Sequence, residues 1–251
     1  MPVKFARTIH QGQSIWTVIE GDTAYVLEGD RFAATPRKGA ALGPATDLEM
    51  LFPLDPTNQI VALFGGWGVG DRDGPGIFIK PYSSLISTGG SMEYPEVATT
   101  VYMEPELAIV IGKTCSKVPA AQAKDYILGY TCVNDTTVFE SKIVTTFPHI
   151  WGKMFDGFGT VGPVIATDID PGNATIRGAV NGKEYLTINS GLLAWNVYEI
   201  VEWVSKVVTL NPGDLISTGA PPGFDSVAIQ PGDTMTVTID GIGSIDSTIR
   251  K

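Results

Sequence analysis

The sequence predicts a mixed α+β fold that is dominated by β-strands, and three observations carry that prediction. Short apolar runs recur along the whole chain, and turn-forming residues separate them. Only two stretches show the spacing of apolar residues that a helix needs. The chain has 251 residues, of which 43% are hydrophobic, which suffices for one sizeable core or for a core and a small second domain.

Residues 1–55 are predicted to form a small N-terminal β domain. Strand-like runs lie at 4–8, 14–19 and 24–27, and turn residues stand between them. The stretch 34–44 carries Pro, Gly and Lys, so we expect it to connect this unit to the rest of the chain.

Residues 56–251 are predicted to form the larger domain. Turn pairs such as Asn181-Gly182 separate its strands. Its strand-like runs are Ile60–Phe64, Ile77–Ile79, Leu107–Ile111, Tyr130–Val133, Thr175–Val180, Leu215–Ser217 and Met235–Ile239. One helix is expected to start after Val118 and to run to about Leu128, with Pro119 in its first turn. A second is expected over 197–208, where apolar residues follow helical spacing.

Charge and composition exclude several classes of function. The formal net charge is -10 and no basic run is present, so nucleic acid and anionic membranes are poor partners. The first residues lack the apolar segment of a signal peptide, and no apolar run approaches the roughly 18 residues of a membrane span. Cys115 and Cys132 lack CxxC spacing and are interpreted as buried free thiols. We expect a cytoplasmic protein.

Three carboxylates form a candidate metal site. Glu104 and Glu106 are two residues apart in a strand-like segment, so their side chains point to the same side. Pro105 between them has no N–H, which places it at a sheet edge or at the start of the strand. Asp135 follows the next strand, where a third ligand would converge. Oxygen ligands suit Mg²⁺, Mn²⁺ or Ca²⁺. The alternative is two solvated glutamates and a turn-capping aspartate.

Two further segments carry candidate site residues. Lys153 lies among aromatic residues and glycines, where it would neutralise a substrate carboxylate or hold an enolate oxygen. A salt bridge between Lys153 and Asp156 on a loop is the alternative. Thr218 and the backbone N–H groups around Gly219 follow a short buried strand and would suit a carboxylate. A purely structural turn is equally consistent with these two residues.

These segments together resemble the fumarylacetoacetate hydrolase family, in its order and with family-like spacing over roughly residues 56–251. Residues 1–55 resemble the small N-terminal domain of many bacterial members. The matching stretches are Phe78-Ile79-Lys80-Pro81, Glu104-Pro105-Glu106 with the strand to Lys113, Gly129 to Asp135, Gly152 to Phe158, Val180-Asn181-Gly182 and Thr209 to Gly223.

The resemblance implies a β-sandwich roll of the family type, with residues 56–251 as the catalytic domain. It implies a small anionic oxo-acid substrate, and a homodimer as the expected assembly. Family members hydrolyse acylpyruvates, decarboxylate oxaloacetate-like acids or isomerise dienedioates. It implies Mg²⁺ (or Mn²⁺ or Ca²⁺) held by Glu104, Glu106 and Asp135, with Lys153 at the substrate, Thr218 and Gly219 near its carboxylate, and Lys80 flanking the site.

One loop departs from the family pattern. Members commonly carry a His–Glu dyad that activates water in the loop at 65–76. Here Trp67 stands where Tyr is expected, Gly70 where His is expected and Asp73 where Glu is expected. Asp73 is therefore the loop's candidate base, and Trp67 is expected to close over the bound acid. His149 is a second candidate catalytic residue, with a packed or surface histidine as its alternative.

The sequence therefore predicts a divalent-metal-dependent enzyme for a small 2-oxo or 1,3-dicarbonyl acid or diacid. Decarboxylation and enol–keto isomerisation need mainly an electron sink for an enolate, whereas hydrolysis also needs an activated water. Without the loop histidine, decarboxylase or isomerase chemistry ranks above acylpyruvate hydrolysis. A catalytically lapsed member that binds a dicarboxylate is the second alternative. Metal binding is expected to weaken below about pH 5, where carboxylates become protonated.

Overall fold

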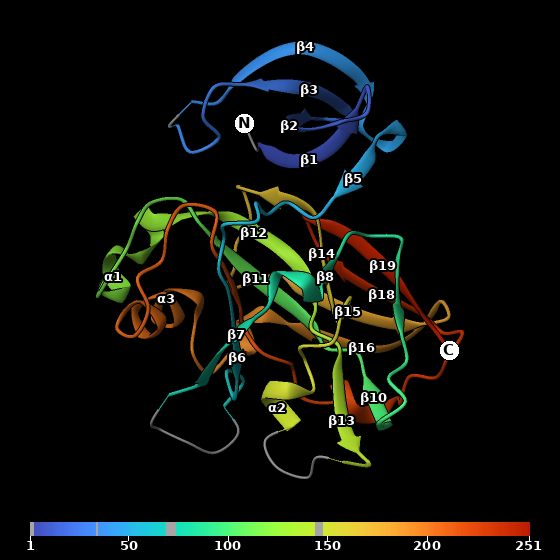
Figure 1. Ribbon diagram of the computed structural model, residues 1–251. Helices are drawn as coiled ribbons and strands as arrows, with labels where there is room; N and C mark the ends of the chain where they lie inside the picture. Colours follow the sequence, from blue (N-terminus) through green and yellow to red (C-terminus); the bar gives the residue numbers. More distant parts are fainter. Residues whose placement is uncertain (1–2, 34, 69–73, 144–147) are drawn as a thin grey trace.

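The computed structural model describes residues 3–33, 35–68, 74–143 and 148–251. It confirms the predicted dominance of strands over helices (Figure 1). Two sheets pack face to face over one main apolar core, to which Leu107, Ile176 and Val237 all belong. Among the described residues, none of the helices is long and apolar enough to cross a membrane.

The N-terminal strands form a curved layer at the top of Figure 1. They are β1 (Lys4–His10), β2 (Gln13–Glu20), β3 (Thr23–Glu28), β4 (Arg37–Pro44) and the short β5 (Glu49–Leu51). Strand β1 also pairs with β14 (Gly159–Ala166), where Phe5 lies opposite Ile165. The backbone ladder is therefore continuous between this layer and the main sheet. The division of the chain at residues 55 and 56 stays a prediction.

The main sheet continues from β14 in the order β12, β11, β17, β6 and β7. These strands are β12 (Ile127–Asn134), β11 (Pro105–Ile111), β17 (Leu215–Ser217), β6 (Ile60–Phe64) and β7 (Gly76–Lys80). The short strand β8 (Leu85–Ile86) is not part of this order and pairs with β14. Every residue of β11 is buried, because the strand has neighbours on both sides and a layer on each face. Pro105 is its first residue, as one of the two predicted placements requires.

The second sheet covers one face of the first. It contains β16 (Lys183–Asn189), β15 (Thr175–Val180), β18 (Thr234–Ile239), β19 (Gly243–Arg250) and β9 (Gly90–Glu93) in that order. Buried and solvent-facing residues alternate along β18 and β19, so one face of this sheet packs on the core. A separate pair, β10 (Ala98–Tyr102) and β13 (Thr137–Ser141), runs beside the site described below.

The helices are shorter than predicted. Helix α1 (Ala120–Ala123) gives way to a 3₁₀ turn and then to β12 at Ile127, so the expected end near Leu128 is wrong. The backbone from Ile127 onward pairs with β11 instead of continuing the helix, and Ile127 lies opposite Ile111. Helix α3 (Val197–Ser205) starts with a capping box and ends earlier than Val208. Helix α2 (Pro148–Trp151) was not predicted.

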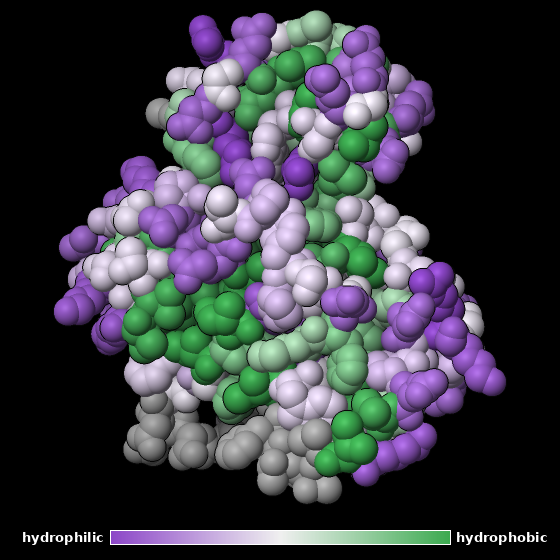
Figure 2. All heavy atoms as spheres, in the orientation of Figure 1, coloured by the Kyte–Doolittle hydropathy of each residue, from purple (hydrophilic) through white to green (hydrophobic). Residues whose placement is uncertain are grey.

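Apolar side chains also gather on the outside of the fold. Figure 2 shows them on the lower left of the view, in the area of α3, β6 and β7. Strand β7 is the last strand of the main sheet, and its Ile79 is 45% exposed. Phe64 of the neighbouring β6 is 38% exposed. An exposed apolar edge is a common site of chain association. The expected homodimer stays a prediction.

Candidate metal centre and substrate pocket

Strand pairing brings the three predicted carboxylates together. Pro105 of β11 pairs with Asn134, the last residue of β12, so Glu104 and Asp135 leave the two strands side by side. The Asp135 N–H donates to the Glu104 carbonyl at 3.0 Å, and the Glu104 N–H donates to Asn134 Oδ1 at 3.1 Å. One carboxylate oxygen from each of Glu104, Glu106 and Asp135 lies within 4.8 Å of the other two. All three side chains are buried, which excludes the alternative of solvated glutamates.

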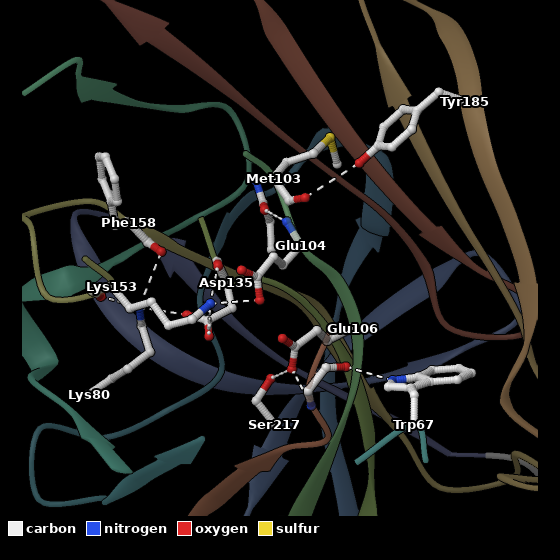
Figure 3. A network of polar contacts seen from close by, with 12 residues as sticks. Trp67, Lys80, Met103, Glu104, Glu106, Asp135, Lys153, Phe158, Tyr185 and Ser217 are labelled. Carbon is white, nitrogen blue, oxygen red and sulfur yellow. Dashed lines mark hydrogen bonds and ion pairs between the residues drawn. The ribbon is translucent and has the colours of Figure 1, made fainter. Parts of the chain in front are cut away.

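Two buried lysines form ion pairs with these carboxylates (Figure 3). Lys153, just after α2, places Nζ 2.6 Å from Glu104 Oε2 and 3.0 Å from Asp135 Oδ2, and it donates to the Asp135 carbonyl at 3.1 Å. Lys80, at the end of β7, lies 2.7 Å from Asp135 Oδ1 and donates to the carbonyls of Lys153 and Phe158. Asp135 therefore accepts both ammonium groups.

The alternative reading of Lys153 as a surface salt bridge with Asp156 is wrong. Asp156 is exposed, whereas Lys153 is 2% exposed and directed to the carboxylates of the site. Lys153 lies in the turn that follows α2, where its N–H donates to the Ile150 carbonyl at 3.3 Å.

Glu106 is held by a different set of contacts. Its Oε2 accepts hydrogen bonds from Ser217 Oγ at 2.5 Å and from the Gly219 N–H at 2.8 Å. The Gly219 carbonyl in turn accepts the indole N–H of Trp67 at 2.8 Å, as Figure 3 shows. Gly219 has a φ of +94°, a conformation that favours glycine and that directs the N–H of this residue to Glu106 and its carbonyl to Trp67. Trp67 thus contacts the same residue that donates its N–H to Glu106.

Burial and charge set the protonation of the group. Burial raises the pKa of Glu104 to about 7 and holds the pKa of Glu106 well above its ordinary range, with neighbouring carboxylates adding to the effect at Glu106. Burial alone would raise the pKa of Asp135 too, but Lys153 and Lys80 hold it below its usual value. Burial lowers the pKa of Lys80. The pKa of Lys153 is raised, because the carboxylates outweigh its burial.

The donor set fits a hard divalent cation. When all three carboxylates are ionised, the two ammonium groups leave one net negative charge in this buried cluster. Glu106 Oε1 is buried and has no hydrogen-bonding partner among the described residues. An unpaired buried carboxylate oxygen is costly, and a cation bound by Glu104, Glu106 and Asp135 would satisfy it. Oxygen-only ligands are those preferred by Mg²⁺, Mn²⁺ and Ca²⁺.

A cavity of about 450 Å³ opens onto this cluster. Glu104 and Lys153 form its inner end, and Trp67 and Gly65 form part of one wall. The apolar remainder of its lining comes from β6, β13 and the Pro-rich segment after Gly219. The size suits a small organic acid.

The other predicted site residues have the following places. The Thr218 hydroxyl donates to the Leu107 carbonyl inside the sheet, and the Gly219 N–H donates to Glu106, so both groups are engaged by the protein itself. Lys80 is directed to protein acceptors. Asp73 lies outside the described residues. His149 belongs to α2, two residues from Trp151, and its side chain lies outside the described part. The roles assigned to these residues stay predictions.

The family follows from comparison with known proteins. The family model for the C-terminal domain of fumarylacetoacetate (FAA) hydrolase matches residues 68–250. The chain belongs to the fumarylacetoacetate hydrolase family. A Mycobacterium tuberculosis relative in this comparison is 37% identical over 227 residues, which is 86% of this chain and 83% of the relative. The predicted resemblance is therefore confirmed.

Two solved structures show the same fold over nearly the whole chain. The 2-hydroxyhepta-2,4-diene-1,7-dioate isomerase of Mycobacterium marinum is 35% identical, with a TM-score of 0.88 over 99% of this chain and 98% of that one. A fumarylacetoacetate hydrolase of Exiguobacterium antarcticum is 25% identical, with a TM-score of 0.87 over 99% of both chains. The family-type fold predicted from the sequence is confirmed.

Sequence reasoning missed the residues that position the cluster. Ser217 was part of a predicted strand, but nothing in the sequence pairs it with Glu106, which is 111 residues away. Asn134 was noted only as part of a matching segment, and its amide fixes the Glu104 backbone. Its place directly before Asp135 was the available signal, because the residue that precedes a ligand is well placed to orient the neighbouring strand.

Proposed function

We propose that the protein is a divalent-metal-dependent enzyme that acts on a small 2-oxo or 1,3-dicarbonyl acid, by decarboxylation or by enol–keto isomerisation. The observation that carries the proposal is the buried cluster of three carboxylates and Lys153 at the inner end of the cavity. Membership of the family supports the metal dependence, and both an isomerase and a hydrolase share the fold, so the fold does not select the reaction.

The residues of the cluster have separable tasks in this proposal. Glu104, Glu106 and Asp135 would hold a divalent ion, which would supply a Lewis acid for the 2-oxo oxygen of the substrate. Lys153 stands at the cavity wall with its charge maintained by Glu104 and Asp135, so it pairs with the substrate carboxylate or the enol oxygen. Lys80 pairs with Asp135 Oδ1, whereas Lys153 pairs with Oδ2 of the same carboxylate.

The reaction itself moves few atoms. In isomerisation, the enol oxygen loses a proton as its C–O bond becomes a carbonyl, and a proton is added at the carbon next to that carbonyl carbon. In decarboxylation, the carbon–carbon bond breaks, carbon dioxide leaves, and the same carbon takes up a proton. Neither reaction consumes water. The sequence of the loop at 65–76 contains no histidine, so the usual water-activating partner is missing there. This is the reason to rank hydrolysis lower.

The histidines of the chain are His10 and His149. His10 ends β1 in the N-terminal layer, at the opposite end of Figure 1 from α2. His149 and Asp73 therefore stay the candidate bases. Asp73 without a histidine partner is a weak base unless burial raises its pKa.

Parallel assays test the proposal. Oxaloacetate decarboxylation, enol–keto exchange of a 2-oxo acid and acylpyruvate hydrolysis are measured with Mg²⁺ and with chelator, on the wild type and on Asp73→Asn. Asp156→Asn, at an exposed aspartate, is the matched control. We expect metal-dependent decarboxylation or exchange, and slow or absent hydrolysis. Brisk hydrolysis that survives Asp73→Asn would contradict the ranking and indicate His149 or a metal-bound water as the base. Tight Mg²⁺ binding without any turnover would indicate a lapsed binding protein.

A further inference from the structure

We propose that the acid taken by this site carries an uncharged apolar or aryl group at its distal end, and not a second carboxylate. The inference rests on the proposed function, because it specifies the substrate class of the same cavity. It narrows the range of acids and diacids to acids with one charged end.

The cavity is polar at one end and apolar beyond it. Glu104 and Lys153 are the charged groups at the inner end, beside the carboxylate cluster. The rest of the lining is mostly apolar and includes Leu63, Phe64, Phe139, Pro221, Pro222 and Phe224. Binding an apolar group against such a surface is favourable, whereas removing water from a charged group there is unfavourable.

An ordered group of rings forms part of this wall. Phe139 and Phe224 both line the cavity, with ring centroids 6.4 Å apart, and each packs edge-on against Tyr102 at 5.6 Å and 6.0 Å. The interplanar angles of the two contacts with Tyr102 are 78° and 86°. These are favourable geometries for aromatic pairs, so the wall exists before a ligand binds. A further apolar or aryl group would extend the same packing.

The charges of the cavity also oppose a second carboxylate. Asp225 lies on the lining near Phe224 and is exposed to solvent. Within the described residues, Lys153 is the one cation on the lining, and it is committed to the inner end. The buried Lys80 is directed to Asp135 and to two backbone carbonyls. A distal carboxylate would therefore lose water, find no cation among these residues and face a like charge.

Unreactive oxamates test the inference, because they share the 2-oxo acid head and differ in the tail. N-isopentyloxamate and N-carboxyethyloxamate have tails of equal length and similar shape, one apolar and one charged. Their affinities are measured by calorimetry at pH 8 with saturating Mg²⁺, beside unsubstituted oxamate. We expect the isopentyl compound to bind at least tenfold more tightly than the carboxyethyl compound. Equal or tighter binding of the carboxyethyl compound would overturn the inference.

Two variants identify the source of the preference. Phe224→Ala should weaken N-isopentyloxamate severalfold and leave oxamate unchanged, because it removes part of the wall only. Asp225→Asn should strengthen N-carboxyethyloxamate about two- to fivefold, as expected for one exposed charge, without affecting N-isopentyloxamate. If neither variant changes these affinities, the assignment of the wall is contradicted.

The same series separates this inference from the proposed function. Unsubstituted oxamate reports on the metal-directed head alone. If oxamate shows no Mg²⁺-dependent binding, the proposed function fails. If oxamate binds only with Mg²⁺ but the carboxyethyl tail is preferred, the function stands and the substrate class is wrong. In that case loss of the preference in Arg72→Met would assign the missing cation to the loop at 65–76.

Discussion

Glu106→Gln is the substitution in which metal binding and stability should change in opposite directions. Glutamine keeps the shape of the side chain, and its carbonyl oxygen can accept the hydrogen bonds that Ser217 and Gly219 donate to Oε2. The amide takes the position of Oε1, the buried oxygen that has no partner among the described residues. The change therefore removes one negative charge from the cluster and little else.

The loss of affinity can be scaled from Coulomb's law. A unit charge about 4 Å from a divalent ion is worth about 8 kcal/mol at an effective dielectric constant of about 20. The cost of removing the charges from water offsets more than half of this attraction. We therefore expect Mg²⁺ affinity to fall by about 3 kcal/mol, which is at least about 100-fold.

The metal-free protein should gain stability from the same change. At pH 8 the wild type either buries the Glu106 charge or takes up a proton to remove it, and both cost free energy. Removing one unpaired buried charge should contribute about 1–3 kcal/mol, which raises the melting temperature by roughly 2–10 °C for a chain of this length.

Calorimetry with Mg²⁺ and thermal melts with chelator at pH 8 measure the two effects. Glu96→Gln, at an exposed glutamate, is the matched control and should change neither. Wild-type metal affinity in Glu106→Gln would remove Glu106 from the ligand set. A melting temperature several degrees below that of the wild type would mean that the carboxylate has a structural role that glutamine does not replace.

Three further predictions follow from the same contacts. Lys153→Met should lower kcat/KM by at least about 100-fold while Mg²⁺ affinity, measured by calorimetry, is unchanged or higher, because a competing cation leaves the cluster; weaker Mg²⁺ binding would contradict this. Trp67→Phe should weaken Mg²⁺ binding by about two- to tenfold, because it removes the hydrogen bond that orients Gly219 toward Glu106. Trp203→Phe, which loses an indole hydrogen bond to the Pro75 carbonyl, is the control and should leave Mg²⁺ binding unchanged. Mg²⁺ affinity, titrated between pH 5 and pH 9, should fall as pH drops through about 7, since Glu104 then binds a proton; an affinity that stays constant down to pH 5 would refute the raised pKa.

The sign of the pH effect on stability is opposite to that on metal affinity. The pKa of Glu104 is raised from its ordinary 4.5 to about 7 in the folded state. The folded protein therefore binds more protons than the unfolded chain between these values. The stabilisation from this group is complete below about 4.5 and is lost as pH rises through about 7. Metal-free protein should melt at a higher temperature at pH 5.5 than at pH 8, to the extent that Glu104 and Glu106 dominate.

The carboxylate cluster could be predicted because its pattern is local. The spacing of Glu104 and Glu106 fixes a shared side of a strand, and Asp135 follows a neighbouring apolar run. The raised pKa of Glu104 moves the expected onset of weak metal binding from about pH 5 to about pH 7, and the sequence does not reveal how deeply these groups are buried. Burial depends on the second sheet and on the Gly219 segment, which come from distant parts of the chain.

Lys153 shows how the surroundings change an interpretation. From the sequence, Lys153 was expected to neutralise a substrate carboxylate or to hold an enolate oxygen. The structure buries its ammonium between Glu104 and Asp135, so removal also leaves two carboxylates without that partner. We now expect a loss of stability at pH 8 in the metal-free protein, which Mg²⁺ should reverse. The prediction that the helix after Val118 reaches Leu128 was wrong because of tertiary surroundings too, since pairing with β11 outweighs local helical preference.

An anomalous difference map of crystals grown with Mn²⁺ and oxalate tests the central claim most directly. Oxalate mimics the enolate of a 2-oxo acid, and Mn²⁺ accepts the same oxygen ligands as Mg²⁺ while scattering anomalously. We predict one strong peak bounded by Glu104, Glu106 and Asp135, with oxalate on its open side toward Lys153 and the cavity. A map with no peak at these carboxylates, or with oxalate bound elsewhere without the metal, would contradict the account.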